Sequence, residues 1–155
     1  MRWPGSFFFT KMNMGPRIFT VTEANALVPR LEEAFTAFDG IRSRLRRLKS
    51  KMDVLEMLWG EEIQSDSNPD RREYTHYASD VDKAKNEFEA VTRQLGAQEI
   101  MLKSVENGLI DFYGVVEGRL VFLCWKRGEK CVEFYHHLED GFDGRRTIAA
   151  ERKAD

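Results

Sequence analysis

The chain has 155 residues, of which 42% are hydrophobic and 32% are charged. That length allows one domain with a buried core, and the composition is typical of a globular protein rather than a disordered one. The formal net charge is −2, from 24 basic and 26 acidic residues, so overall charge gives no support to a nucleic-acid or anionic-membrane partner. No apolar stretch approaches the roughly 20 residues that span a bilayer, which disfavours a membrane protein.

Both ends of the chain are expected to lie outside the folded part. Residues 1–18 hold only a short apolar triplet after a Pro-Gly pair, which is too short for the core of a signal peptide. We therefore expect a disordered N-terminal extension, a frayed tail over residues 149–155, and a single domain over residues 19–148. Without a secretion signal, the expected location is the cytoplasm.

A long first helix is predicted between Thr20 and Gly60. Thr20 and Glu23 have the spacing of a capping box, in which each side chain can bond the backbone amide of the other residue. Apolar residues then recur at alternating steps of three and four as far as Trp59, which is the seam of a coiled coil. Gly60 is expected to end the helix, and Pro29 predicts a kink or break in the turn before it.

A second helix is predicted after a polar connection. Asn68 and Pro69 suit an N-cap and a first helical residue, a similar seam runs from Tyr74 to Val105, and the following Asn-Gly pair is a stop signal. The two helices would form a long antiparallel, coiled-coil-like hairpin. Its predicted layers are Trp59 with Tyr74, Met52 with Val81, Leu45 with Phe88, Phe38 with Leu95, and Leu31 with Leu102.

Charged flanks and exposed apolar positions add two expectations for this hairpin. The register pairs Arg44 with Glu87, and Lys51 with Asp80, across the seam. Several large apolar side chains lie off the seam and need another surface, so we expect self-association, for instance as a four-helix arrangement. These side chains are Phe35, Met57, Leu58, Ile100 and Met101.

After Gly108 the apolar period changes to that of strands. Three runs joined by turns at Glu117-Gly118 and at residues 126–129 predict a small three-stranded antiparallel meander, so the fold class is α+β. If the turns set the register, Cys124 faces Cys131 across the ladder. Neither cysteine belongs to a CxxC motif, so both are interpreted as thiols, not as a disulfide or zinc ribbon. The same register places Asp111 and His136 on opposite faces of the sheet.

Four stretches of the chain resemble the motifs of a bacterial family catalogued as domain of unknown function 2203. They read FTVTEANALVPRL, GLIDF, LCWKRGE and FYHHLEDGFDGR, and the resemblance extends from Phe19 to Ile148. The chain departs from the pattern at Tyr113, where proline is usual, and at His137, where an acid is common. The resemblance implies no established activity. Mapped onto this chain, the family's recurring polar positions are Asp111, Glu129, His136 and Arg145.

Those four residues are the candidate binding site. An acid, a histidine and an arginine could hold a metal ion and an anion, with His136 as the metal ligand, or a carboxylate could orient the histidine as a general base. Arg145 follows two glycines and could bind a carboxylate or phosphate with two hydrogen bonds. The alternative is structural: Asp111 caps a junction, Glu129 completes a turn, His136 bonds a backbone carbonyl, and Arg145 pairs with an acid.

The basic run from Arg42 to Lys51 offers a different function, with six basic residues in ten. These residues fall at the solvent-facing and flanking positions of a coiled coil, and no aromatic side chain interleaves with them to stack bases. A solvated helix face is therefore favoured over a nucleic-acid surface.

The sequence as a whole favours a non-enzymatic, homo-oligomeric interaction or scaffold module with a polar loop patch. It predicts no cofactor, and the expected partner is a protein or a small anionic ligand. The alternative is a metal- or anion-dependent small-molecule binding protein or hydrolase that uses His136, Glu129 and Arg145.

Overall fold

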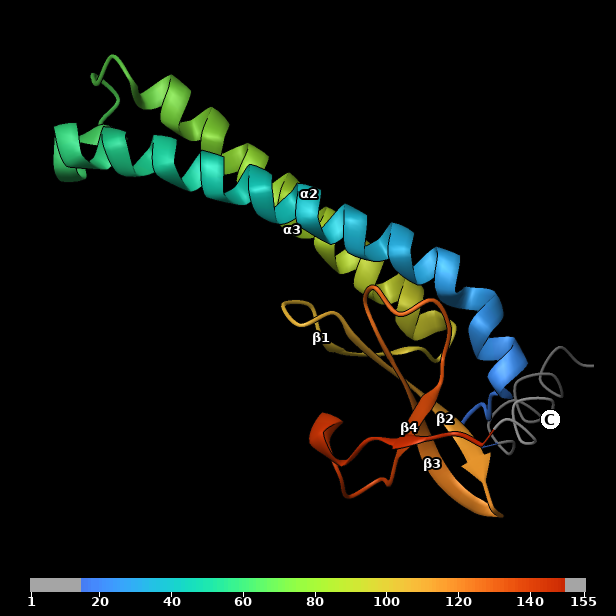
Figure 1. The fold of residues 1–155 in the computed structure, drawn as a ribbon. Coiled ribbons are helices and arrows are strands. Elements are labelled where there is room, and N and C mark those ends of the chain that lie inside the picture. Colours follow the sequence, from blue (N-terminus) through green and yellow to red (C-terminus); the bar gives the residue numbers. More distant parts are fainter. Residues whose placement is uncertain (1–14, 150–155) are drawn as a thin grey trace, which may run out of the picture. The chain divides into compact units, whose positions relative to one another are not determined.

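The computed structural model describes residues 15–149, and these residues divide into two compact units (Figure 1). The helical unit comprises Glu33–Gln94, and the sheet unit comprises residues 15–32 and 95–149. The predicted α+β fold class is confirmed. Most of the expected N-terminal extension, residues 1–18, and nearly all of the expected frayed tail, residues 149–155, lie outside the described residues. Within the described part, no helix has the length and apolar character needed to cross a membrane.

Helix α2 spans Val21–Trp59 and begins and ends where the sequence predicts. The capping box is formed, because the Thr20 amide donates to Glu23 Oε1 at 3.2 Å and the Glu23 amide donates to Thr20 Oγ1 at 3.1 Å. The helix continues through Pro29, so a break there is not observed. Gly60 adopts a φ of +58° and begins the short 3-10 helix η1, Gly60–Gln64. A residue with that backbone conformation ends an α-helix.

Helix α3 spans Arg71–Ala97 and is shorter than predicted. Its expected continuation to Val105 is wrong, because the amides of Gln98 and Ile100 both bond to the Leu95 carbonyl and Glu99 takes a φ of +60°. The segment that follows is a strand whose backbone pairs within the sheet. The spacing of its apolar residues fits both the helical period and the strand period, so the sequence pattern alone does not distinguish helix from strand.

The two helices run antiparallel along the helical unit, as one contact just before α3 and two contacts between the helices show. The Trp59 indole donates to Asp70 Oδ2 at 2.8 Å, and the Tyr74 hydroxyl donates to Glu56 Oε1 at 2.6 Å. Farther along, the predicted pair of Arg44 and Glu87 is present, with Arg44 Nη1 donating to Glu87 Oε1 at 3.2 Å. The contacts progress from the connection toward the other end, which is the order that an antiparallel pair requires.

The predicted layers of this pair need one correction. The ring of Phe38 lies 4.8 Å from the ring of Phe88, whereas the sequence paired Phe38 with Leu95 and Leu45 with Phe88. Phe38 is fully buried and Phe88 is half-buried, so Phe38 is the more central side chain. Seam spacing fixes which faces meet but not the axial offset. The connection sets that offset, and it contains η1, which the sequence analysis did not predict.

The sheet has five antiparallel strands in the order β1-β2-β3-β4-β5, so the prediction of three strands is wrong. The two outer strands are absent from the predicted meander, because the apolar spacing of β1 also fits the second helix and β5 has only two residues. The strands are β1 Met101–Ser104, β2 Leu109–Val116, β3 Arg119–Lys126, β4 Phe134–His136 and β5 Arg146–Thr147.

The pairing of β2 with β3 follows the register that the Glu117-Gly118 turn predicts. Asp111 pairs with Cys124, and Ile110 pairs with Trp125. Glu117 and Gly118 have φ values of +54° and +74°, which are the two left-handed residues of a tight hairpin turn. A turn of that kind matches the twist of the strands and allows no slip of register.

The pairing of β3 with β4 differs from the prediction. Cys124 lies across from Phe134, not from Cys131. The chain between the two strands bends irregularly instead of making a tight four-residue turn, and the Val132 amide donates to Asn25 Oδ1 at 2.6 Å on the way. This shift of register by an odd number of residues turns every side chain of β4 to the other face. His136 therefore shares a face with Asp111, which corrects the predicted separation of these two residues.

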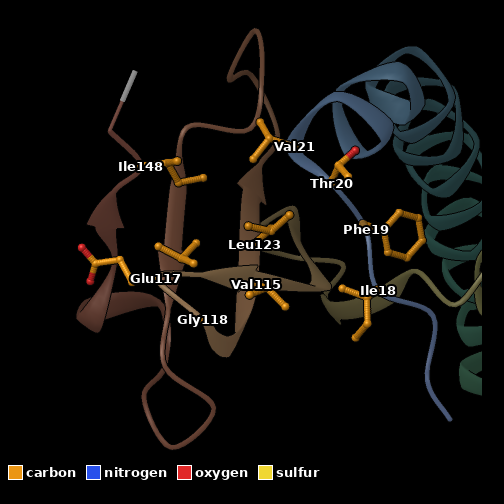
Figure 2. Close-up of a pocket in the computed structure, with 10 residues that line it drawn as sticks. Ile18, Phe19, Thr20, Val21, Val115, Glu117, Gly118, Leu123 and Ile148 are labelled. Atoms are coloured by element: carbon orange, nitrogen blue, oxygen red, sulfur yellow. The ribbon is translucent and has the colours of Figure 1, made fainter. Parts of the chain in front are cut away.

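One face of the sheet packs in the core of the sheet unit with the first turns of α2. Phe19, just before α2, lies 4.9 Å from the ring of Phe112 and donates its amide to the Tyr113 carbonyl. A hollow at this end has a volume of about 450 Å³ and a wall of both polar and apolar groups (Figure 2). Its labelled residues are Ile18, Phe19, Thr20, Val21, Val115, Glu117, Gly118, Leu123 and Ile148. The polar cluster lies on the other face.

Candidate functional site

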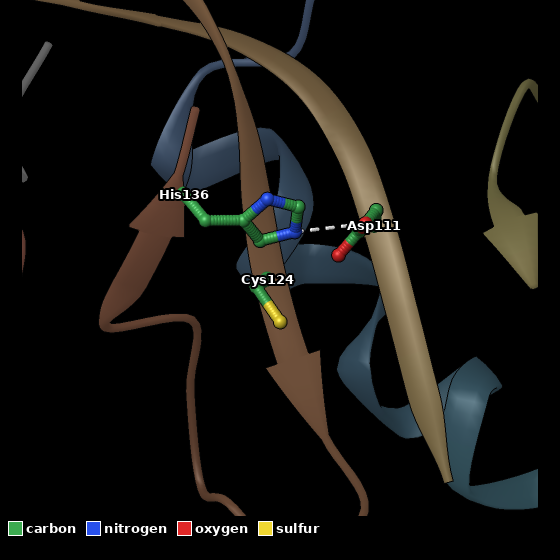
Figure 3. A group of neighbouring side chains, drawn as sticks. All are labelled: Asp111, Cys124 and His136. Carbon is green, nitrogen blue, oxygen red and sulfur yellow. Dashed lines mark hydrogen bonds and ion pairs between the residues drawn. The ribbon is translucent and has the colours of Figure 1, made fainter. Parts of the chain in front are cut away.

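Three adjacent strands bring an acid, a thiol and an imidazole together on one face of the sheet (Figure 3). Asp111 projects from β2, Cys124 from β3 and His136 from β4. A carboxylate oxygen, the thiol sulfur and a ring nitrogen all lie within 4.8 Å of one another. The three residues are 3%, 1% and 4% exposed, so the cluster is buried. Buried polar groups carry a desolvation cost, and each therefore needs a partner.

The hydrogen bonds of His136 define which ring atoms donate. Nδ1 lies 2.9 Å from the carbonyl oxygen of His137, which can only accept, so Nδ1 carries a hydrogen. Nε2 lies 3.0 Å from Asp111 Oδ2. The lone pair of a neutral imidazole and an ionised carboxylate oxygen are both acceptors, and two acceptors repel at that distance. The contact therefore requires either a hydrogen, carried by one of the two atoms, or a metal ion between them.

Cys124 is a protonated thiol in the metal-free site. Burial, together with the nearby Asp111 carboxylate, raises the pKa of the Cys124 thiol to about 12, while the positive charge of Arg145 acts in the opposite direction. Cys124 and Cys131 are thiols that form no disulfide, in agreement with the prediction, and Cys131 is only half-buried. A thiol of this kind is unreactive by itself and becomes a thiolate only when a cation compensates its charge.

The other two predicted site residues, Glu129 and Arg145, form a second pair beside the cluster. Arg145 Nη2 donates to Glu129 Oε1 at 2.6 Å, and Glu129 Oε2 accepts from the Lys126 amide at 2.8 Å. The guanidinium also lies over two rings, 4.0 Å from the centroid of Phe134 and 4.6 Å from that of Phe142. Arg145 is thus paired through Nη2 and stacked on both rings, while its buried Nε atom has no hydrogen-bond partner in the described part of the chain. Its predicted role in binding an anion stays a prediction.

A pocket of about 180 Å³ opens onto the cluster. Its floor includes Asp111, Cys124 and His136, and a cation, an acid and several apolar side chains complete its wall. The remaining lining residues are Lys103, Leu109, Phe122, Leu138, Asp140, Gly141 and Phe142. Gly141 and Phe142 belong to the loop that the sequence analysis expected near His136, and Phe142 begins the short 3-10 helix η2, Phe142–Gly144.

Cys124 is the site residue that sequence reasoning missed. The turn at Glu117-Gly118 already placed Cys124 opposite Asp111, so the signal was present. It was overlooked because the register of β4 was wrong, and that error removed His136 from the same face. Without the histidine, a half-buried cysteine was the simpler interpretation.

The family model described as "Uncharacterized conserved protein (DUF2203)" matches residues 17–148. The chain belongs to this family, as its motifs indicated. Neither the search of curated proteins nor the search of solved structures found a match. The biochemical role must therefore be argued from the site itself.

Proposed function

We propose that the sheet unit binds a divalent transition metal ion of the zinc class through Asp111, Cys124 and His136. The observation that supports this most is the approach of His136 Nε2 to Asp111 Oδ2 at 3.0 Å in a buried site that also holds a thiol. One divalent cation at that point would be bound by all three groups together.

The ligand types and their spacing suit such an ion. Zinc binds thiolate sulfur at about 2.3 Å and imidazole nitrogen or carboxylate oxygen at about 2.0–2.2 Å, so tetrahedral ligand atoms lie about 3–4 Å apart. The present atoms lie within 4.8 Å of one another, so small side-chain rotations close the site. The hydrogen bond from His136 Nδ1 to the His137 carbonyl oxygen fixes the tautomer that leaves Nε2 to bind a metal ion, as such bonds do for metal-binding histidines.

Titration of the metal-free protein with Co²⁺ tests the site directly. Wild type is expected to bind one equivalent and to develop the intense near-ultraviolet absorption of a thiolate-to-cobalt transition, because Cys124 is the proposed sulfur ligand. Cys124→Ala is expected to lose this absorption and at least about tenfold in affinity. Zn²⁺ should displace the cobalt and bleach the band.

Cys131→Ala is the matched control, since Cys131 is the other cysteine of the chain and does not line the pocket. It should retain the full absorption. Equal loss of the band in both cysteine variants would show non-specific thiol binding, and no band in wild type would show that Cys124 is not a metal ligand. Either result contradicts the proposal.

We also propose, for the helical unit, that it associates with a second copy of the chain. Three apolar side chains near the end of α2 are 56%, 86% and 69% exposed, and together they form a patch that water solvates poorly. These residues are Val54, Met57 and Leu58. Sedimentation at tens of micromolar protein is expected to give a dimer or larger assembly, and replacing Met57 and Leu58 with serine should shift it to monomer. A wild-type monomer over that range would contradict this proposal.

A further inference from the structure

We infer that the metal ion held by Asp111, Cys124 and His136 takes a small monocarboxylate as an additional ligand, with Lys103 pairing its charge. The inference rests on the metal site proposed above. Three protein ligands leave at least one coordination position of a zinc-class ion for another group. Because the three ligand residues line one pocket, that position faces the pocket.

The size and walls of the pocket limit what can enter it. Its volume of about 180 Å³ is below the roughly 300–1,000 Å³ of pockets for drug-sized ligands, so the ligand is small. Phe122, Phe142 and two leucines give the pocket a mostly apolar wall. Such a wall suits a ligand in which a short hydrocarbon chain is attached to the group that coordinates the metal ion.

The charges around the pocket favour a ligand with a single negative charge. A divalent ion with one thiolate and one carboxylate has no net charge, so an anion is not repelled by the centre. Lys103 adds a positive charge to the lining, and its ammonium group lies 4.8 Å from the centroid of Phe122. Asp140 adds one negative charge to the same lining, so a dianion such as inorganic phosphate is disfavoured relative to a monoanion.

Acetate added to the cobalt-loaded protein is the direct probe. It is expected to change the visible ligand-field absorption, which depends on coordination number, and to leave the sulfur-to-cobalt band in place. Acetamide, a neutral molecule of the same shape, is expected to have no effect, and inorganic phosphate a weaker one than acetate. Lys103→Gln removes the ammonium group without touching a metal ligand and should weaken the acetate response about fivefold.

Lys130→Gln is the matched control, because Lys130 is an exposed lysine of the sheet unit that does not line the pocket. It should respond to acetate as wild type does. Retained sulfur-to-cobalt absorption with no acetate response, or equal responses to acetate and acetamide, would overturn the carboxylate inference while the metal site stands. An acetate response that Lys103→Gln and Lys130→Gln share would overturn the role of Lys103. Absence of the sulfur-to-cobalt band itself would instead count against the proposed metal function.

Discussion

Trp125→Ala is expected to lower the free energy of unfolding by about 3–5 kcal/mol, the range for truncating a large buried side chain. Trp125 is fully buried on β3, on the face opposite the polar cluster, and pairs with Ile110 on β2. Its indole N–H donates to the Glu129 carbonyl at 2.9 Å. The substitution therefore opens a cavity in the core and also leaves a carbonyl without its donor. Urea or thermal denaturation followed by circular dichroism measures the loss.

Two further variants separate these causes. Trp125→Phe removes the N–H but keeps most of the ring volume, so its main cost is the roughly 1 kcal/mol of the lost hydrogen bond, and it should destabilise less than Trp125→Ala, which also opens a cavity. Trp59→Ala removes a half-buried indole from the helical unit and is expected to be milder. If Trp125→Ala and Trp59→Ala destabilised equally, Trp125 would not be the central core residue of the sheet unit.

Features set by neighbouring residues were predictable from the sequence. The capping box of Thr20 and Glu23, the end of α2 at Gly60 and the register across Glu117-Gly118 all depend on local backbone chemistry. Each signal involves residues that are adjacent or three apart. Few backbone conformations are open to such short segments, so the residue types determine which one forms.

Features set by contacts between distant parts of the chain were not predictable in the same way. The register of β4 depends on an irregular connection that is tied to α2 by the bond from the Val132 amide to Asn25. The end of α3 at Ala97 depends on the pairing of β1 with β2, which competes with helix for the same residues. Tertiary pairing overrides a helical apolar pattern of this kind.

The candidate site was predictable from the sequence only in part. The resemblance supplied Asp111, Glu129, His136 and Arg145, and the structure arranges them as two pairs, Asp111 with His136 and Glu129 with Arg145. The addition of Cys124 turns the first pair into a possible ligand set. That addition required the correct face of β4, which no local signal specifies.

His136→Ala is expected to destabilise the metal-free protein by about 3–5 kcal/mol, because it leaves the buried Asp111 carboxylate without its partner. Asp111 and His136 have side chains that are 4% and 5% exposed, so water cannot replace the lost contact. Thermal or urea denaturation in the presence of a chelator measures the effect. His76→Ala is the control, since His76 pairs with Asp80 on the surface of α3 and is 68% exposed. Its substitution should change stability by less than about 0.5 kcal/mol.

The double variant Asp111→Leu/His136→Leu distinguishes a structural pair from a functional one. A buried ionic pair bears the desolvation cost of both groups, and replacing the whole pair with apolar residues of similar size is often neutral or stabilising by about 1–4 kcal/mol. We therefore expect the double variant to recover most of the stability that His136→Ala loses, and to lose the sulfur-to-cobalt absorption that wild type develops. Recovery of stability with loss of metal binding means that folding does not require the polar pair and that ligand binding does. A double variant as unstable as His136→Ala would instead show that the pair acts as a structural link between β2 and β4, and a double variant that keeps the sulfur-to-cobalt absorption would show that Asp111 and His136 are not metal ligands.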